Sequence, residues 1–295
     1  MIAFHTLDVF TETPFSGNPL AVVPDAGGLS TAQMQTIARE FNLSETIFVM
    51  PPRDPAHSAR VRIFFPTAEI PFAGHPTIGC AILLAEMAHE GDFATTITLE
   101  EEAGLVPVAV TREGGRIIAE LTAPVLPYPA GPAPEAQLLA AALGLAPDDL
   151  GPHRPGCHEG GPRFVYAPLR DLDALARARA TEPHWSRLMA AHGVDSVYLY
   201  APGDGACDLR ARMFSPTAGI PEDPATGSAS AILAAQLLAN GAIQDGTTRL
   251  TLRQGVEMGR PSTLRLTIEA AGGALTAVRI AGSAVRIGEG RLRLP

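Results

Sequence analysis

Four polar side chains have the types and positions needed for acid–base chemistry on a small acid: Glu45, His75, Asp223 and Ser228. Glu45 lies in FNLSETIFV, between the end of an expected helix and an apolar strand, so its carboxyl group is expected to be half-buried. Burial raises the pKa of a carboxyl group toward the range useful for proton transfer. The sequence therefore indicates Glu45 as a candidate general acid/base, although an exposed loop glutamate would show the same pattern.

The other three residues lie at the starts of two apolar helices. His75 stands at the beginning of the first helix, and Asp223 stands at the corresponding point before the second, with Ser228 in its first turn. Each residue also has an ordinary structural use there, since aspartate and serine cap helices and a histidine can orient its neighbours. Because both turns are rich in polar groups, the duplication favours a functional site at the two helix starts.

Backbone N–H groups at these helix starts are the predicted anion site. The first N–H groups of a helix lack partners within the helix, and the helix dipole favours negative charge there. The segments 74–79 and 225–229, which include Gly74 and Gly227, can hold a carboxylate from both sides if they face one cleft. Further candidate binding groups come from Asn18, in a Gly-Asn-Pro turn, and from the backbone of Gly259.

An internal repeat accounts for the pair of helices. Residues 62–71, RIFFPTAEIP, recur as RMFSPTAGIP at 212–221, and in both copies a Gly/Pro-rich turn and an Ala/Leu/Ile-rich helix follow. A helix that is apolar on nearly all faces is surrounded by protein. We therefore expect an α+β fold of two pseudo-symmetric lobes, each a curled, mostly antiparallel sheet wrapped around a central buried helix.

The repeat also predicts the domain boundaries. The N-terminal lobe is expected to span 1–122 and to be completed by a C-terminal strand at 283–295, and the C-terminal lobe to span 123–282. A proline-rich segment at 123–134 is the predicted linker. The active site is expected in the cleft between the lobes.

Turn and cap residues give the expected helix bounds. Ser30 and Gln33 form a capping-box pattern at the start of an amphipathic helix. The first buried helix is expected to begin at Pro76 and to end near Gly91. The second is expected to begin near 224–225 and to end at Asn240–Gly241.

Composition excludes several classes of protein. The chain has 295 residues, of which 46% are hydrophobic, and its net charge of -9 argues against nucleic acid or an anionic membrane as partner. It has neither a basic, apolar signal segment nor a run of about 18 apolar residues. Three scattered cysteines fit the reducing cytoplasm, and dispersed histidines without paired cysteines predict no metal site.

Taken in order, these motifs resemble the PhzF-like proteins of phenazine biosynthesis, within the diaminopimelate-epimerase-like fold. The matching segments cover almost the whole chain: LDVFTETPFSGNPLAVV (7–23), FNLSETIFV (41–49), FFPTAEIPFAGHPTIGCA (64–81), RMFSPTAGIPEDPATGSA (212–229) and QGVEMGRPS (254–262). The resemblance implies a homodimer with no metal, nucleotide or flavin cofactor. It implies that Glu45 shuttles a proton and that His75, Asp223 and Ser228 hold or polarise the substrate.

The resemblance also narrows the chemistry. Epimerases and racemases of this fold use one cysteine at each helix start, where this chain has Ala73–Gly74 and Asp223–Pro224. An isomerase that shifts a proton along an unsaturated amino or hydroxy acid is therefore favoured, with trans-2,3-dihydro-3-hydroxyanthranilate as the family's best-known substrate. Two alternatives stay open: epimerisation or racemisation by Glu45 with Asp223, and a small-molecule-binding protein without turnover.

Overall fold

The computed structural model describes all residues, 1–295, and divides into two compact units. The N-terminal unit comprises Met1–Thr122 and Ala281–Pro295, and the C-terminal unit comprises Ala123–Ile280. Each unit contains one long apolar helix, α2 (Gly74–Ala88) or α6 (Gly227–Ala239), packed against strands. None of the helices is long and apolar enough to cross a membrane.

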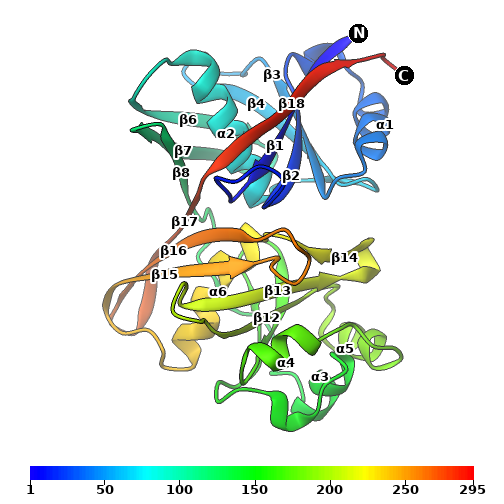
Figure 1. Ribbon diagram of the computed structural model, residues 1–295, viewed down its shortest axis with the longest axis vertical. Coiled ribbons are helices and arrows are strands. Elements are labelled where there is room, and N and C mark those ends of the chain that lie inside the picture. Colours follow the sequence, from blue (N-terminus) through cyan, green and yellow to red (C-terminus); the bar gives the residue numbers. More distant parts are fainter. The chain divides into compact units, whose positions relative to one another are not determined.

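Both ends of the chain meet in one part of the N-terminal unit (Figure 1). Strand β1 (Ile2–Val9) pairs antiparallel with β2 (Asn18–Val23) on one side and with β18 (Ala284–Leu292) on the other. Strand β3 (Glu45–Met50) runs parallel to β2 and antiparallel to β4 (Ala59–Phe64). Because β2 and β3 are parallel, their first residues, Asn18 and Glu45, lie at the same edge of the sheet.

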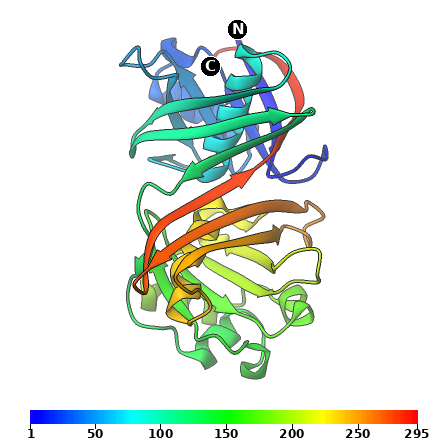
Figure 2. The ribbon, with the colours of Figure 1, turned by 90° about the vertical axis from the view of Figure 1, so that its left-hand side faces the viewer.

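A second group of strands covers α2 in this unit. The short β5 (Glu69–Ile70) pairs with β4, and β6 (Phe93–Glu101), β7 (Gly104–Glu113) and β8 (Arg116–Thr122) follow as an antiparallel meander. Strand β6 joins the group by running parallel to β4. Figure 2 shows these strands crossing the helix, and α2 contacts all three strands of the meander.

The expected burial of α2 is confirmed, whereas its expected bounds were slightly wrong. Eleven of its residues are buried. The helix begins at Gly74, two residues before Pro76, and ends at Ala88, before the expected stop near Gly91. Proline is tolerated in the first turn because its missing N–H has no helical partner there, so Pro76 can sit inside the helix. The predicted capping box is present on α1 (Thr31–Phe41), where Ser30 and Gln33 bond each other's backbone N–H groups.

The strand pairings of the C-terminal unit repeat those of the N-terminal unit. Parallel β11–β12, antiparallel β12–β13, antiparallel β13–β14, parallel β13–β15 and antiparallel β15–β16 correspond to β2–β3, β3–β4, β4–β5, β4–β6 and β6–β7. The strands are β9 (Tyr128–Pro129), β10 (Gly156–Glu159), β11 (Arg163–Pro168), β12 (Val197–Pro202), β13 (Leu209–Ser215), β14 (Ile220–Asp223), β15 (Gly246–Gln254), β16 (Ser262–Ala271) and β17 (Ala274–Gly282). This shared order confirms the duplicated α+β architecture.

Helix α6 is the counterpart of α2. Ten of its residues are buried, and it packs against β10, β11 and β16. It begins at Gly227, two or three residues later than the sequence suggested, and ends at Ala239, just before the expected Asn240–Gly241. The segment before it, through Pro224 and Ala225, is a buried turn between β14 and the helix.

Three further helices and three short 3-10 turns complete the chain. Helices α3 (Ala136–Ala142), α4 (Leu172–Arg177) and α5 (His184–His192) lie together in the C-terminal unit (Figure 1). Buried residues of all three helices belong to one apolar cluster with Trp185. The 3-10 turns are Ala26–Gly28, Pro147–Asp149 and Pro216–Ala218. The predicted linker at 123–134 is partly ordered structure, since β9 pairs with β10.

Candidate active site

Three of the predicted residues meet at the start of α2. His75 is the second residue of the helix, and its Nδ1 atom lies 3.2 Å from Glu45 Oε2 and 3.4 Å from Asn18 Nδ2. Asn18 and His75 are buried, and Glu45 is 9% exposed. We call Asn18, Glu45, Gly74 and His75 the N-terminal half-site. The parallel pairing of β2 with β3 brings the first two together, and α2 adds the histidine.

A glycine turn fixes Asn18 in this half-site. Gly17, directly before it, has a φ of 68°, and a Cβ atom there would lie 2.4 Å from the Val9 carbonyl oxygen. Only glycine adopts this backbone at low cost and fits the space. The turn therefore lets β2 begin with the Asn18 side chain directed to His75.

The His75 ring is neutral at ordinary pH. Burial lowers its pKa to about 3, and a hydrogen bond from the ring to the Pro19 carbonyl opposes this only in part. The approach to Glu45 is therefore a close contact with an uncharged ring and not an ion pair. The other ring nitrogen, Nε2, is buried and has no hydrogen-bond partner in the described chain.

No side chain caps the start of either central helix. The N-cap residues are Ala73 for α2 and Thr226 for α6, and neither makes a side-chain capping hydrogen bond. The N–H groups of the first turn, which include those of Gly74 and Gly227, therefore make no hydrogen bond to a side-chain cap. Such a start favours an anionic group.

Asp223 does not serve as an ordinary N-cap. Its Oδ2 accepts a 2.6 Å hydrogen bond from the Thr226 hydroxyl, and its backbone carbonyl accepts one of 2.8 Å from Gln254 Nε2. Gln254 Nε2 also donates to Thr226 Oγ1 at 3.0 Å, and Gln254 Oε1 accepts from the Thr226 N–H at 3.1 Å. The three buried residues form one network that fixes the Asp223 carboxylate beside the start of α6.

The remaining C-terminal candidates lie on the two elements next to this network in the chain, α6 and the turn after β15. Ser228 is half-buried as the second residue of α6, directly after the buried Gly227. Gly259 belongs to the turn after β15, where its N–H donates to the Val256 carbonyl. We call Asp223, Gly227, Ser228 and Gly259 the C-terminal half-site.

A second glycine allows the turn after β15 to lie close to the start of α6. Gly255 has a φ of 74°, and a Cβ atom there would lie 2.7 Å from the Pro224 carbonyl oxygen. The close approach brings the 255–260 turn against the segment that follows Asp223. Neither Thr226 nor Gln254 was selected from the sequence, although the Thr-Gly-Ser string at the helix start was a signal for the former.

Three reactive side chains outside the two half-sites have structural roles. Glu69 and Glu222 form ion pairs with Arg62 and Arg212, which lie at equivalent points of the repeat. Cys80 is fully buried, and burial raises the pKa of its thiol, so core packing is its role.

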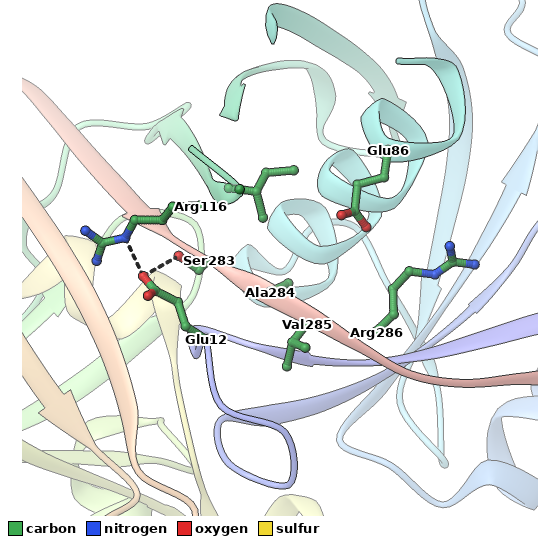
Figure 3. A pocket seen from close by; sticks show the side chains of 9 residues that line it. Glu12, Glu86, Arg116, Ser283, Ala284, Val285 and Arg286 are labelled. Carbon is green, nitrogen blue, oxygen red and sulfur yellow. Dashed lines mark hydrogen bonds and ion pairs between the residues drawn. The ribbon is translucent and has the colours of Figure 1, made fainter. Parts of the chain in front are cut away.

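A pocket elsewhere in the N-terminal unit contains none of the predicted site residues (Figure 3). Glu12 accepts hydrogen bonds there from Arg116 and Ser283, at 2.6 and 3.3 Å, and Glu86 pairs with Arg112. Half of the Glu12 and Arg116 side-chain surface is exposed. These charges satisfy each other at the surface, so the pocket offers no comparable acid–base group.

Comparisons with known proteins agree over nearly the full length. Residues 7–290 match the family model PhzC-PhzF, described as phenazine biosynthesis-like protein. An uncharacterized isomerase of Mesorhizobium japonicum is 44% identical, over 97% of this chain and 96% of that protein. The trans-2,3-dihydro-3-hydroxyanthranilate isomerase of Pseudomonas fluorescens is 39% identical, over 98% of each chain.

Solved structures confirm the fold. A PhzF-family phenazine biosynthesis protein of Bacillus anthracis superposes with a TM-score of 0.88 at 27% identity, covering 99% of both chains. A probable proline racemase of Agrobacterium radiobacter gives a TM-score of 0.66 over 100% of this chain and 94% of that one. Because the racemase is only 17% identical to this chain, the comparison shows a shared fold alone.

Proposed function

The chain belongs to the phenazine biosynthesis-like (PhzF) family of isomerases, and from that premise we propose that it shifts a proton within a small unsaturated amino or hydroxy acid, without a cofactor. Glu45 is the general acid/base in this proposal. The observation that carries it is the 3.2 Å contact between Glu45 and a neutral His75 beside an uncapped helix start. A base, an orienting group and an anion site thus occur in one half-site.

We further propose that the two half-sites act on one substrate. The repeat supports this, because each half-site has one buried carboxyl group, Glu45 or Asp223, and lies at a helix start without a side-chain cap. The N–H groups and the Ser228 hydroxyl hold the substrate carboxylate, and Asp223 holds its amino or hydroxyl group. Glu45 takes a proton from one carbon and returns it to another while the double bond shifts, so the product is an isomer of the substrate.

His75 fits this role as a neutral hydrogen-bonding group. A cationic imidazole would compete for the Glu45 carboxylate, whereas a neutral ring leaves Glu45 able to take up a proton. The substrate class follows from the relatives, among which trans-2,3-dihydro-3-hydroxyanthranilate isomerases are 38–39% identical to this chain. The absence of cysteine at the two helix starts argues against a two-thiol epimerase.

We also propose a cytoplasmic homodimer. The three cysteines are all free and buried, as in proteins of a reducing compartment. The dimer follows from the family resemblance, and light scattering of the purified protein tests it directly.

Proton NMR in deuterated water tests the proposed reaction. The purified protein is incubated with trans-2,3-dihydro-3-hydroxyanthranilate and a panel of small unsaturated amino acids. Deuterium at a new carbon together with a moved double bond supports the proton shift. Deuterium at a retained stereocentre supports epimerisation instead, and binding without exchange across the panel supports a protein without turnover.

A further inference from the structure

Glu101 in the N-terminal unit occupies the position that Gln254 occupies in the C-terminal unit. Each is the last residue of an equivalent strand, β6 or β15, and each contacts a threonine at the start of the central helix. Glu101 Oε1 lies 2.7 Å from the hydroxyl of Thr77 in α2, and Gln254 Nε2 lies 3.0 Å from that of Thr226 before α6. The two units therefore share one arrangement, in which the last residue of a strand contacts a threonine at the start of the central helix.

The hydrogens in the Glu101 contact can be assigned by elimination. The Thr77 hydroxyl also lies 2.7 Å from the Ala73 carbonyl oxygen, which can only accept. A hydroxyl group has one hydrogen and cannot donate to both oxygens, so with Thr77 donating to Ala73 the hydrogen of the Thr77–Glu101 contact comes from Glu101. In the other unit, Gln254 donates to Thr226, and Thr226 donates onward to Asp223.

Burial supports a protonated Glu101. The residue is 9% exposed, and its Oε2 atom is buried with no hydrogen-bond partner. An ionised carboxylate there would leave a charge uncompensated, which is costly in a protein interior. Burial raises the pKa of Glu101 to about 8, and only a Thr77 hydroxyl that donated to the carboxylate would oppose this.

The surroundings of Glu101 supply no positive charge that would stabilise its ionised form. From α2 it faces Thr77 and Cys80, and from β7 its partner is Gly104. Charged side chains of β4, β5 and the residue after β6 line a separate surface pocket to which Glu101 does not contribute: Arg60, Arg62, Glu69 and Glu102. Arg62 is paired with Glu69.

We propose that Glu101 is a positioning residue that acts as a neutral hydrogen-bond donor, holding Thr77 and thereby the first turn of α2 that carries His75. Its effect on turnover rests on the proposed function, whereas its effect on stability does not. Ionisation of Glu101 would turn the Thr77 hydroxyl away from the Ala73 carbonyl and release the first turn. A glutamine, the residue used in the other unit, donates through its amide at every pH.

Two variants separate these possibilities. Glu101→Gln keeps a donor of the same shape, and Glu101→Leu keeps the approximate size without a donor. The free energy of unfolding in urea is measured for the wild type and both variants at pH 6, 7 and 9. Because the folded-state pKa is raised above the unfolded value, the stabilising protonation is lost as pH rises through about 8. The wild type should lose stability relative to Glu101→Gln over this range.

Activity gives the second readout. At pH 7, Glu101→Gln should retain wild-type kcat, and Glu101→Leu should lose about tenfold in kcat with little change in KM, because the first turn of α2 is misplaced. Above pH 8, the wild type should lose activity relative to Glu101→Gln. If Glu101→Leu does not fold, Thr77→Val takes its place, because it removes the same hydrogen bond from the threonine side.

Two results would overturn the proposal. One is a Glu101→Gln variant as impaired at pH 7 as Glu101→Leu, since that would require a charge at this position. The other is equal pH dependence of unfolding in the wild type and Glu101→Gln, since that would mean no titrating proton. If no substrate is turned over by the wild type, the proposed function fails while the unfolding comparison still decides the role of Glu101.

Discussion

His75 approaches Glu45 as a neutral imidazole, with 3.2 Å between its Nδ1 atom and Glu45 Oε2. The ring is buried, and burial holds its pKa near 3, far below that of a free histidine. Glu45 therefore faces an uncharged ring and is not neutralised by a cation. In the proposed mechanism, this leaves the carboxylate able to exchange protons with a substrate.

The neutral state of His75 predicts how stability depends on pH. Its folded-state pKa is depressed, so the stabilisation present above the unfolded value of about 6.5 is lost as pH falls. Between pH 6.5 and pH 5 the wild type should lose about 2 kcal/mol of unfolding free energy relative to His75→Gln. Urea unfolding at both pH values measures this difference.

His184→Gln, in α5, is the control for removal of a histidine. It should keep the pH dependence of the wild type. If the unfolding free energies of the wild type and His75→Gln changed equally with pH, this would contradict a neutral buried ring.

The Gly17 turn predicts a backbone effect on the half-site. Gly17→Ala adds a Cβ atom 2.4 Å from the Val9 carbonyl oxygen at a φ of 68°. It should lower the unfolding free energy by about 1–3 kcal/mol and displace Asn18. Gly28→Ala is the matched control, because nothing lies within 4 Å of its Cβ position. Thermal denaturation of the two variants side by side decides the matter, and equal melting temperatures would speak against a strained Gly17.

Ser228 and Ser230 lie two residues apart in α6 and should separate binding from stability. Ser228→Ala should raise KM about tenfold, because a hydrogen bond to a charged carboxylate is lost. Ser230 Oγ lies 2.9 Å from the Tyr198 hydroxyl in the core, so Ser230→Ala should cost about 1–3 kcal/mol of stability with KM unchanged. Steady-state kinetics and urea unfolding of both variants test this, and an unchanged KM in Ser228→Ala would remove Ser228 from the binding site.

Much of the fold follows from the sequence, because its signals are local. The repeat at 62–71 and 212–221 and the apolar helix bodies suffice to predict two similar units with buried helices. The helices α3, α4 and α5 were not predicted individually, because they are short, and their positions depend on packing around Trp185.

The residues of the candidate site stand out in the sequence, whereas their supporting contacts do not. Glu45, His75 and Asp223 stand out because polar groups beside apolar elements are unusual. Gln254 and Glu101 lie 28 and 24 positions from their threonine partners, at the ends of strands with ordinary patterns. Only the sheet pairings bring such residues to a helix start, so no local signal reveals them.

Thr226 should be needed to hold Asp223. Thr226→Val removes the hydroxyl that donates to Asp223 and accepts from Gln254, and should cost about 1–3 kcal/mol of unfolding free energy. It should also lower kcat/KM, because the carboxylate loses its partner. Thr226→Ser keeps the hydroxyl and should restore both. If valine and serine variants behave alike, the network does not position Asp223.

The central claim is that Glu45 transfers the proton, and Glu45→Gln in deuterated water tests it most directly. Removal of a general acid/base should slow isomerisation and deuterium incorporation by about 10²–10⁴-fold, while substrate binding measured by calorimetry persists. Glu40→Gln, on the exposed face of α1, serves as the control and should keep the wild-type rate. A Glu45→Gln enzyme that incorporates deuterium at the wild-type rate would contradict the account.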